Sequence, residues 1–115
     1  MKILIGILIF FSLYASNLSS YEMKVSGSFK YSSNWGIKDE DRKNAELELK
    51  KTAIKKYANE KYKGNKSGYR DFKKVENQIY QSVSEYVNII SFLVDDNDKK
   101  NKTLNLTAKV EINEM

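Results

Sequence analysis

Two segments in which apolar and polar side chains alternate one by one lie near the two ends of this chain, and they constrain its fold more than any other feature. In residues 21–31 the aromatic and aliphatic side chains take the odd positions, and in residues 104–112 the aliphatic side chains take the even ones. A two-residue period is that of a half-buried β-strand. Gly27 occupies one apolar position of the first segment, which indicates a bulge or the close approach of another element.

Between these strands the chain predicts a long helix. Three acidic residues, Asp39, Glu40 and Asp41, stand where the unpaired amides at a helix N-terminus favour negative charge, and neither glycine nor proline follows until Gly64. The apolar residues fall into two neighbouring rows, which make a face wide enough to pack on a sheet and on a second helix. These rows are Ala45, Leu49, Ala53 and Tyr57, and beside them Leu47, Ile54 and Ala58.

A polar break at residues 64–68 precedes a second, shorter helix, predicted from apolar residues at three- and four-residue intervals. Residues 86–94 are rich in β-branched and aromatic side chains and favour a strand. The polar turn at residues 95–101 then joins this strand to residues 104–112 as a hairpin. The intervals that predict the helix are set by Phe72, Val75, Ile79 and Val83.

The expected order is strand, helix, helix, strand, strand. Two helices on one face of a three-stranded, mainly antiparallel sheet make an α+β two-layer sandwich. The opposite face of the sheet carries enough polar side chains to meet solvent, namely Lys24, Ser26, Lys30, Thr107, Lys109 and Glu111. We see no repeat or second domain in residues 21–115, so we expect one small domain there.

Residues 1–20 have the build of a secretory signal peptide. One lysine precedes an unbroken apolar run from Ile3 to Phe11, and small and polar residues follow it. The run is shorter than the roughly 20 apolar residues that cross a bilayer. The alternative is a retained N-terminal anchor, because Ala15, Ser16 and Ser20 are all weak matches to a cleavage site. The chain has no cysteine, so no lipid anchor of the bacterial lipoprotein kind is expected. We therefore expect an exported protein of the bacterial periplasm or cell surface.

Composition narrows the function classes. Without cysteine, an exported domain depends on packing alone, and without histidine it lacks the commonest general base and the commonest transition-metal ligand. No pairing of a nucleophile with a base is visible. We predict that the chain is not an enzyme, and we assign no catalytic, cofactor-binding or metal-binding residue.

Two acidic clusters could in principle supply oxygen ligands to a metal ion. Residues 39–41 are better explained as the N-terminus of a helix. The cluster of Asp95, Asp96 and Asp98 lacks the glycine and the distal glutamate of an EF-hand loop, and an acidic hairpin turn is ordinary. We expect no cofactor at either cluster.

The formal net charge is +5, and basic residues with tyrosines among them are dense between residues 50 and 74. Such a surface attracts anionic partners, although Glu46, Glu48 and Glu60 break up the positive field, and export argues against nucleic acid. Trp35 stands alone in the first loop, where we expect it to close over the end of the core; the alternative is an exposed side chain that contacts a partner. The basic residues are Lys50, Lys51, Lys55, Lys56, Lys61, Lys63, Lys66, Arg70, Lys73 and Lys74, and the tyrosines are Tyr57, Tyr62 and Tyr69.

Several runs of residues resemble the N-terminal domain of the flagellar assembly protein T family, and a related family of twenty-kilodalton envelope lipoproteins. The runs are residues 25–29 (VSGSF), residues 41–45 (DRKNA) leading into a helix with small or apolar residues every four positions, residues 79–87 before the hairpin, and residues 104–112 as the last strand. The resemblance covers most of residues 21–112. It implies a bacterial envelope domain without catalysis that binds other envelope components.

The function we expect is therefore that of a non-enzymatic exported assembly or adaptor module, associated with a flagellar or another envelope machine. It would dock a protein partner through a helix face or an open sheet edge. The alternative is a binder of anionic wall polymer or lipid surface through its lysine-rich helices. Salt distinguishes the two, since only the charged surface loses binding as ionic strength rises.

Overall fold

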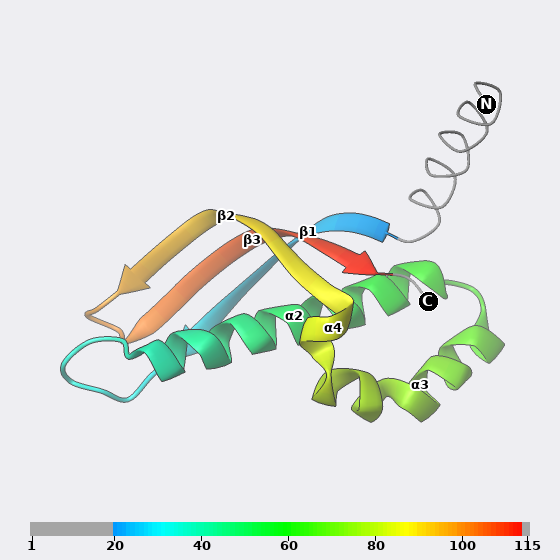
Figure 1. Ribbon diagram of the computed structural model, residues 1–115, viewed down its shortest axis with the longest axis horizontal. Helices are drawn as coiled ribbons and strands as arrows, with labels where there is room; N and C mark the ends of the chain where they lie inside the picture. Colours follow the sequence, from blue (N-terminus) through cyan, green and yellow to red (C-terminus); the bar gives the residue numbers. More distant parts are fainter. Residues whose placement is uncertain (1–19, 114–115) are drawn as a thin grey trace, which may run out of the picture.

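The computed structural model describes residues 20–113, so residues 1–19 of the predicted signal peptide lie outside the described part of the chain. Two helices and a short third one lie between the first strand and a hairpin of the other two (Figure 1). In chain order the elements are β1 (Ser20–Lys30), α2 (Asp39–Lys61), α3 (Lys66–Gln81), α4 (Val83–Tyr86), β2 (Val87–Asp98) and β3 (Thr103–Asn113).

The sheet is antiparallel throughout, with the strand order β1-β3-β2. The last strand of the chain is thus the central one, and β1 and β2 are the two edges. In Figure 1 the sheet arches over α2. The α+β fold with a three-stranded antiparallel sheet is confirmed.

The core lies between α2 and the sheet. All five aliphatic residues predicted to face inward from β3 are at most 2 % exposed. Alanines at Ala45, Ala53 and Ala58 are buried on α2 together with Leu49 and Ile54, and small side chains allow a helix to approach a sheet closely. The wide apolar face predicted for this helix is therefore confirmed.

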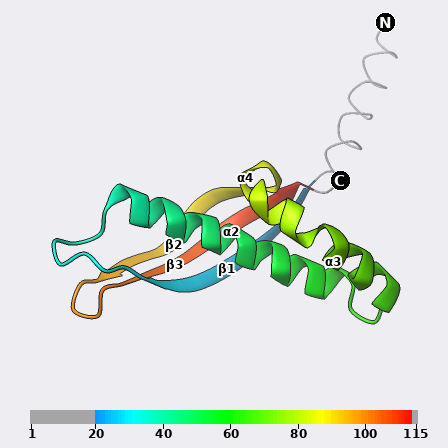
Figure 2. The ribbon, with the colours of Figure 1, turned by 90° about the horizontal axis from the view of Figure 1, so that it is seen from below.

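The helical layer differs from the expectation in two ways. The second helix ends at Gln81, where Ser82 N–H donates to the Ile79 carbonyl at 3.1 Å, and the short helix α4 follows. Helix α3 packs mainly against α2 and α4, while α2 alone spans all three strands. Figure 2 shows α2 crossing the sheet with α3 beside its C-terminal half. The reason is that α3 buries only Phe72 and Ile79, a stripe too narrow to cover a sheet.

Gly27 sits under an aromatic ring of its own strand. A Cβ atom at this position would lie 2.5 Å from Cζ of Phe29, a shorter distance than Cβ atoms in proteins keep from other heavy atoms. The register of β1 against β3 runs without interruption from Ser20 to Lys30. Of the two explanations offered for this glycine, close approach is therefore correct, and β1 carries no bulge.

Two irregularities occur in β2 instead. Ile90 and Leu93 have no partner in the register with β3. A β-bulge adds a residue to one strand and bends it. The two extra residues leave large aliphatic side chains in solvent, with Ile90 45 %, Leu93 53 % and Val94 46 % exposed.

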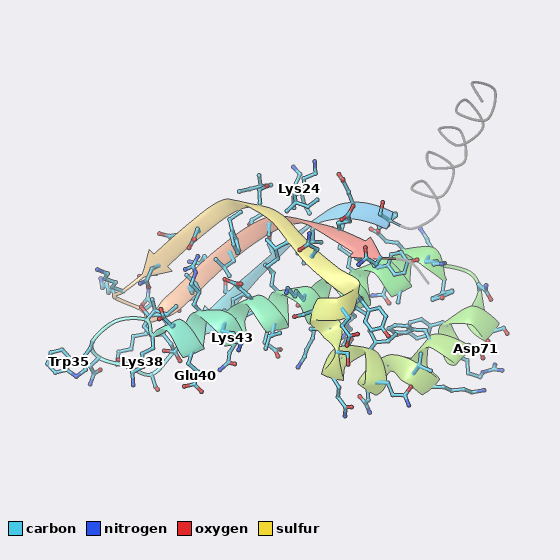
Figure 3. All side chains as sticks on the ribbon, in the orientation of Figure 1. Lys24, Trp35, Lys38, Glu40, Lys43 and Asp71 are labelled. Atoms are coloured by element: carbon cyan, nitrogen blue, oxygen red, sulfur yellow. The ribbon has the colours of Figure 1, made fainter. Side chains whose placement is uncertain are left out.

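The face of the sheet away from the helices is polar along β1 and β3, as predicted. Ser26 and Thr107 hydroxyls hydrogen-bond at 2.8 Å, and the Ser28 hydroxyl donates to Asn105 Oδ1 at 2.6 Å. Lys24 points outward from this face in Figure 3. Within residues 20–113 no helix combines the length and apolarity needed to cross a membrane.

Candidate functional site

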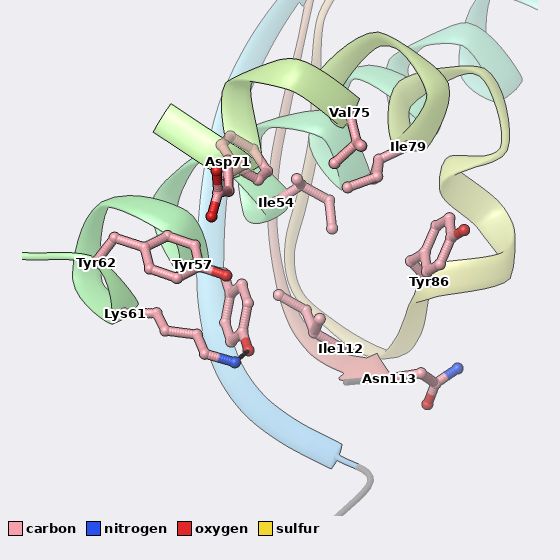
Figure 4. Close-up of a pocket in the computed structure, with 11 residues that line it drawn as sticks. Ile54, Tyr57, Lys61, Tyr62, Asp71, Val75, Ile79, Tyr86, Ile112 and Asn113 are labelled. Atoms are coloured by element: carbon pink, nitrogen blue, oxygen red, sulfur yellow. Dashed lines mark hydrogen bonds between the residues drawn. The ribbon is translucent and has the colours of Figure 1, made fainter. Parts of the chain in front are cut away.

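An apolar groove lies where the C-terminal half of α2, the length of α3, the start of the α4–β2 segment and the end of β3 meet. It encloses about 260 Å³. Figure 4 shows aliphatic side chains from two helices and from β3 facing one another across it. The groove is lined by Ile54, Tyr57, Lys61, Tyr62, Asp71, Phe72, Val75, Ile79, Tyr86, Ile112 and Asn113.

The turn between α2 and α3 sets the position of this groove. Gly64 adopts a φ of +77°, a left-handed conformation that L side chains rarely adopt. Asn65 then caps α3, its Oδ1 accepting from Gly68 N–H at 2.8 Å. The chain thereby turns back, and Phe72 packs with its ring centroid 6.3 Å from that of Tyr62. The two helices are joined at this end by aromatic side chains.

The rim of the groove is polar. Lys61 donates to the Tyr57 hydroxyl at 2.9 Å, and its Nζ lies 5.4 Å and 5.9 Å from the ring centroids of Tyr57 and Tyr62. Asp71 Oδ1 lies 3.8 Å from Lys74 Nζ. Val75 is 40 % exposed although it belongs to the apolar row of α3. An apolar interior with a few polar groups at its rim is the usual build of a binding pocket.

A polar network occupies α3 elsewhere. Glu76 accepts from Lys73 at 2.9 Å and from the Tyr80 hydroxyl at 3.0 Å. The hydrogen bond from Lys73 holds the pKa of Glu76 below its ordinary value, and the same bond raises the pKa of Lys73. Burial, with the hydrogen bond to Glu76, raises the pKa of Tyr80 to about 12. These groups hold one another in place on the helix.

The lysine-rich region is divided among several contacts. Lys50 donates to the Ser84 hydroxyl, Lys51 pairs with Glu48, and Lys56 donates to the Lys24 carbonyl at 3.0 Å. One basic surface stands out at the turn between α2 and α3, and we call it the turn surface. It forms an open hollow of about 540 Å³ lined by Tyr62, Gly64, Asn65, Lys66, Tyr69, Arg70 and Lys73.

Contacts with neighbouring residues account for both acidic clusters. At the start of α2, Asp41 accepts from the Lys38 amide at 3.2 Å, which confirms the helix-terminus interpretation. In the hairpin, Asp95 pairs with Arg42, while Asp98 accepts from the Asn101 amide side chain at 2.8 Å and has its pKa lowered by that bond. No group of three acidic residues within residues 20–113 is placed to hold a metal ion.

Trp35 contradicts its expected role. Its side chain is 96 % exposed in the loop between β1 and α2, so it does not close over the core. Figure 3 places it at one end of the molecule, far from Asp71 beside the groove. Tyr31, at the end of β1, is the buried aromatic residue near this loop, and it donates to Asn97 Oδ1 at 2.5 Å.

No family model, curated protein or solved structure matches this chain. The resemblance to the flagellar assembly protein T family stays a prediction. The groove itself was not foreseen. The sequence shows the apolar row on α3 that lines the groove. Tyr62 and Tyr86 lie beside this row only because of the angles at which the helices meet, and no sequence pattern specifies those angles.

Proposed function

We propose that this chain is a non-enzymatic exported envelope protein that acts as an assembly or adaptor module by docking a protein partner. The observation that carries the proposal is the apolar groove between α2, α3, α4 and the end of β3. Export rests on residues 1–20 of the sequence. The proposal agrees with the resemblance to envelope assembly proteins.

The chemistry of the groove favours a peptide-like occupant. Ile54, Val75 and Ile112 face its interior and offer only dispersion and hydrophobic contact, while the exposed carboxylate of Asp71 at the rim offers an acceptor (Figure 4). One aliphatic or aromatic side chain fits such a volume, and an amide N–H of the neighbouring main chain of the same partner meets the carboxylate. Anchoring by one buried side chain with a polar rim is the common design of protein interfaces.

Site-specific photocrosslinking in the producing cells tests this function. A photoreactive amino acid at Val75 should yield an adduct with one identifiable exported protein. The same amino acid at Asn77, exposed on the same helix but outside the groove lining, is the matched control. Absence of an adduct at Val75, or the same adduct from both positions, would count against the proposal.

The turn surface supports the second candidate function, which is weak binding of anionic wall polymer or lipid. No carboxylate lines this hollow, and Lys66 and Arg70 are exposed. Among residues 20–113, neither basic side chain takes part in an ion pair. Cations interleaved with tyrosines attract anionic polymers.

Vesicles containing an anionic phospholipid test this second function. Binding should fall steeply between low and physiological ionic strength, and the double substitution Lys66→Ala with Arg70→Ala should remove most of it. Lys43→Ala with Lys100→Ala changes the net charge equally at distant exposed positions and should leave most of the binding. Equal losses from both pairs would show that net charge, rather than the turn surface, attracts the vesicles.

A further inference from the structure

Among residues 20–113 no strand pairs with the outer edge of β1, and the register of β1 with β3 is regular. The register with β3 ends at Lys30 opposite Thr103, and one residue further on Tyr31 N–H donates to the Lys102 carbonyl at 3.0 Å. Hydrogen-bonding direction alternates along an antiparallel strand. The odd-numbered residues of β1 therefore bond to β3, and the even-numbered ones direct their amide and carbonyl groups away from the sheet. The Lys24 carbonyl fits this rule, because it accepts from a side chain of α2, Lys56.

The other edge of the sheet is unsuited to strand pairing. The bulges at Ile90 and Leu93 break the spacing of backbone groups along β2. Three aspartates, Asp95, Asp96 and Asp98, follow in the same strand. Bulges and inward or outward charges are the devices that protect sheet edges from pairing. Strand β1 has no bulge over its eleven residues.

We propose that β1 pairs with β1 of a second copy of this chain, antiparallel and with Ser26 on the two-fold axis. In this register Ser26 lies opposite Ser26 of the second copy, Lys24 opposite its Ser28, and Glu22 opposite its Lys30. All three pairs join even-numbered residues, whose amide and carbonyl groups point away from β3. Each pair can therefore form backbone hydrogen bonds between the two copies. The two three-stranded sheets then join into one continuous sheet of two-fold symmetry.

Charge selects this register. The two Glu22–Lys30 pairs are complementary: Lys30 forms no ion pair within residues 20–113 of its own chain, and it would become the second cation beside Glu22, which lies 3.2 Å from Lys109 of its own chain. Moving the axis to Gly27 places Lys24 opposite Lys30, which is a like-charge pair. Moving it to Val25 places Glu22 opposite Ser28 and leaves no ion pair. Opposite charges directly across two strands stabilise a sheet and like charges destabilise it.

The inner face agrees with the same register. Met23 of one copy lies opposite Phe29 of the other, and both side chains are only half-buried in the single chain. Pairing extends the apolar layer across the two-fold axis. Lys56 must release the Lys24 carbonyl, and an exposed lysine does so at little cost.

Single cysteines test the register cleanly, because the chain has none of its own. Ser26→Cys places two cysteines at a hydrogen-bonded pair, with Cα atoms about 5.5 Å apart, within the range of a disulfide. Ser28→Cys is the matched control, since it also replaces a serine on the outer face with one cross-strand hydrogen bond. Its two copies lie four residues out of register, about 14 Å apart.

Under mild oxidation and on a denaturing gel without reductant, the exported protein with Ser26→Cys should run as a covalent dimer, while Ser28→Cys should run as a single chain without a crosslink. Equal crosslinking of both variants, or of neither, would overturn the proposed pairing. A partner strand from a different protein would likewise leave Ser26→Cys without a self-crosslink.

Sedimentation equilibrium of the protein without cysteine gives a second, independent measurement. Lys30→Glu places a carboxylate opposite Glu22 of the second copy at each end of the interface, and it should weaken dimerisation by roughly tenfold. Lys100→Glu, the same charge change away from β1, is the control and should leave dimerisation unchanged. A protein that sediments as a monomer at every concentration, or dimers equally weakened by both substitutions, would contradict the proposal.

Discussion

The guanidinium of Arg42 lies over the ring of Phe92, 5.7 Å from its centroid, and pairs with Asp95 three residues further along β2. Arg42 also lies 3.6 Å from Glu46 one turn along α2. The bulge at Leu93 comes between Phe92 and Asp95, and it lets one arginine reach both side chains. Through this cluster, the first turns of α2 hold the irregular edge strand against the helix.

Arg42→Ala should therefore lower the free energy of unfolding by about 1–2 kcal/mol, the sum expected of one cation–π contact and partly exposed ion pairs. Lys43→Ala, an exposed neighbour, should change it by less than about 0.5 kcal/mol. Urea denaturation of both variants measures the difference. Equal effects of the two substitutions would mean that the cluster contributes nothing specific.

The network on α3 predicts a pH dependence. The folded pKa of Glu76 is lowered from 4.5, so its contribution to stability is present above that pH and is lost as pH falls through the folded pKa. The pKa of Lys73 is raised from 10.5, so its contribution is present below that pH and is lost above it. The stability difference between the natural chain and Glu76→Gln should thus be constant at neutral pH and shrink below pH 4.5.

Tyr80→Phe provides the matched variant for this network, because it removes one donor to Glu76 and keeps the ring. It should show a smaller loss than Glu76→Gln with the same acid dependence. Thermal unfolding followed by circular dichroism across the acid range measures both. A difference that persists unchanged at low pH would contradict the account.

The alanines of α2 predict a different kind of sensitivity. Ala53 is fully buried against the sheet, and enlarging a well-packed position costs about 1–3 kcal/mol. Ala53→Leu should therefore destabilise the fold, whereas Thr52→Leu, on the exposed side of the same turn, should change stability by less than about 0.5 kcal/mol. Chemical denaturation compares the two, and equal effects would show that α2 is not closely packed there.

Trp35 provides a built-in probe, since it is the one tryptophan of the chain. A side chain 96 % exposed should emit as an indole in water and be fully accessible to iodide quenching. Unfolding should therefore shift its emission very little. A blue-shifted emission protected from iodide would show that the loop folds back over the core, as its sequence first indicated.

Much of this fold could be predicted from periodicity. The alternation in residues 104–112 and the four-residue rows from Ala45 to Tyr57 each depend on local geometry, and both appear as expected. The bulges at Ile90 and Leu93 could not be predicted, because they are defined by the pairing of β2 with β3 and not by a local pattern in the sequence. The first extra residue reverses the parity of the strand, so that Phe92 faces the helix side, and the second restores it, so that Asp95 faces that side as well and both meet Arg42.

The candidate site was less accessible to sequence reasoning. Val75 belongs to an apolar row, and such rows are usually buried. Whether it is covered depends on the angle at which α3 leaves the turn at Gly64, which no local pattern specifies. Trp35 is a second case, because no local pattern specifies whether a lone aromatic side chain in a loop is covered, and this one is exposed.

The affinity between the purified protein and the partner crosslinked at Val75 tests the docking proposal most directly. Val75→Asp should weaken binding by at least about tenfold, because it places an unpaired charge in the apolar groove. Asn77→Asp, with the same charge change outside the groove lining, should leave the affinity unchanged, and binding should persist at physiological salt. Equal affinity of the Val75→Asp variant, or binding lost on addition of salt, would contradict the account.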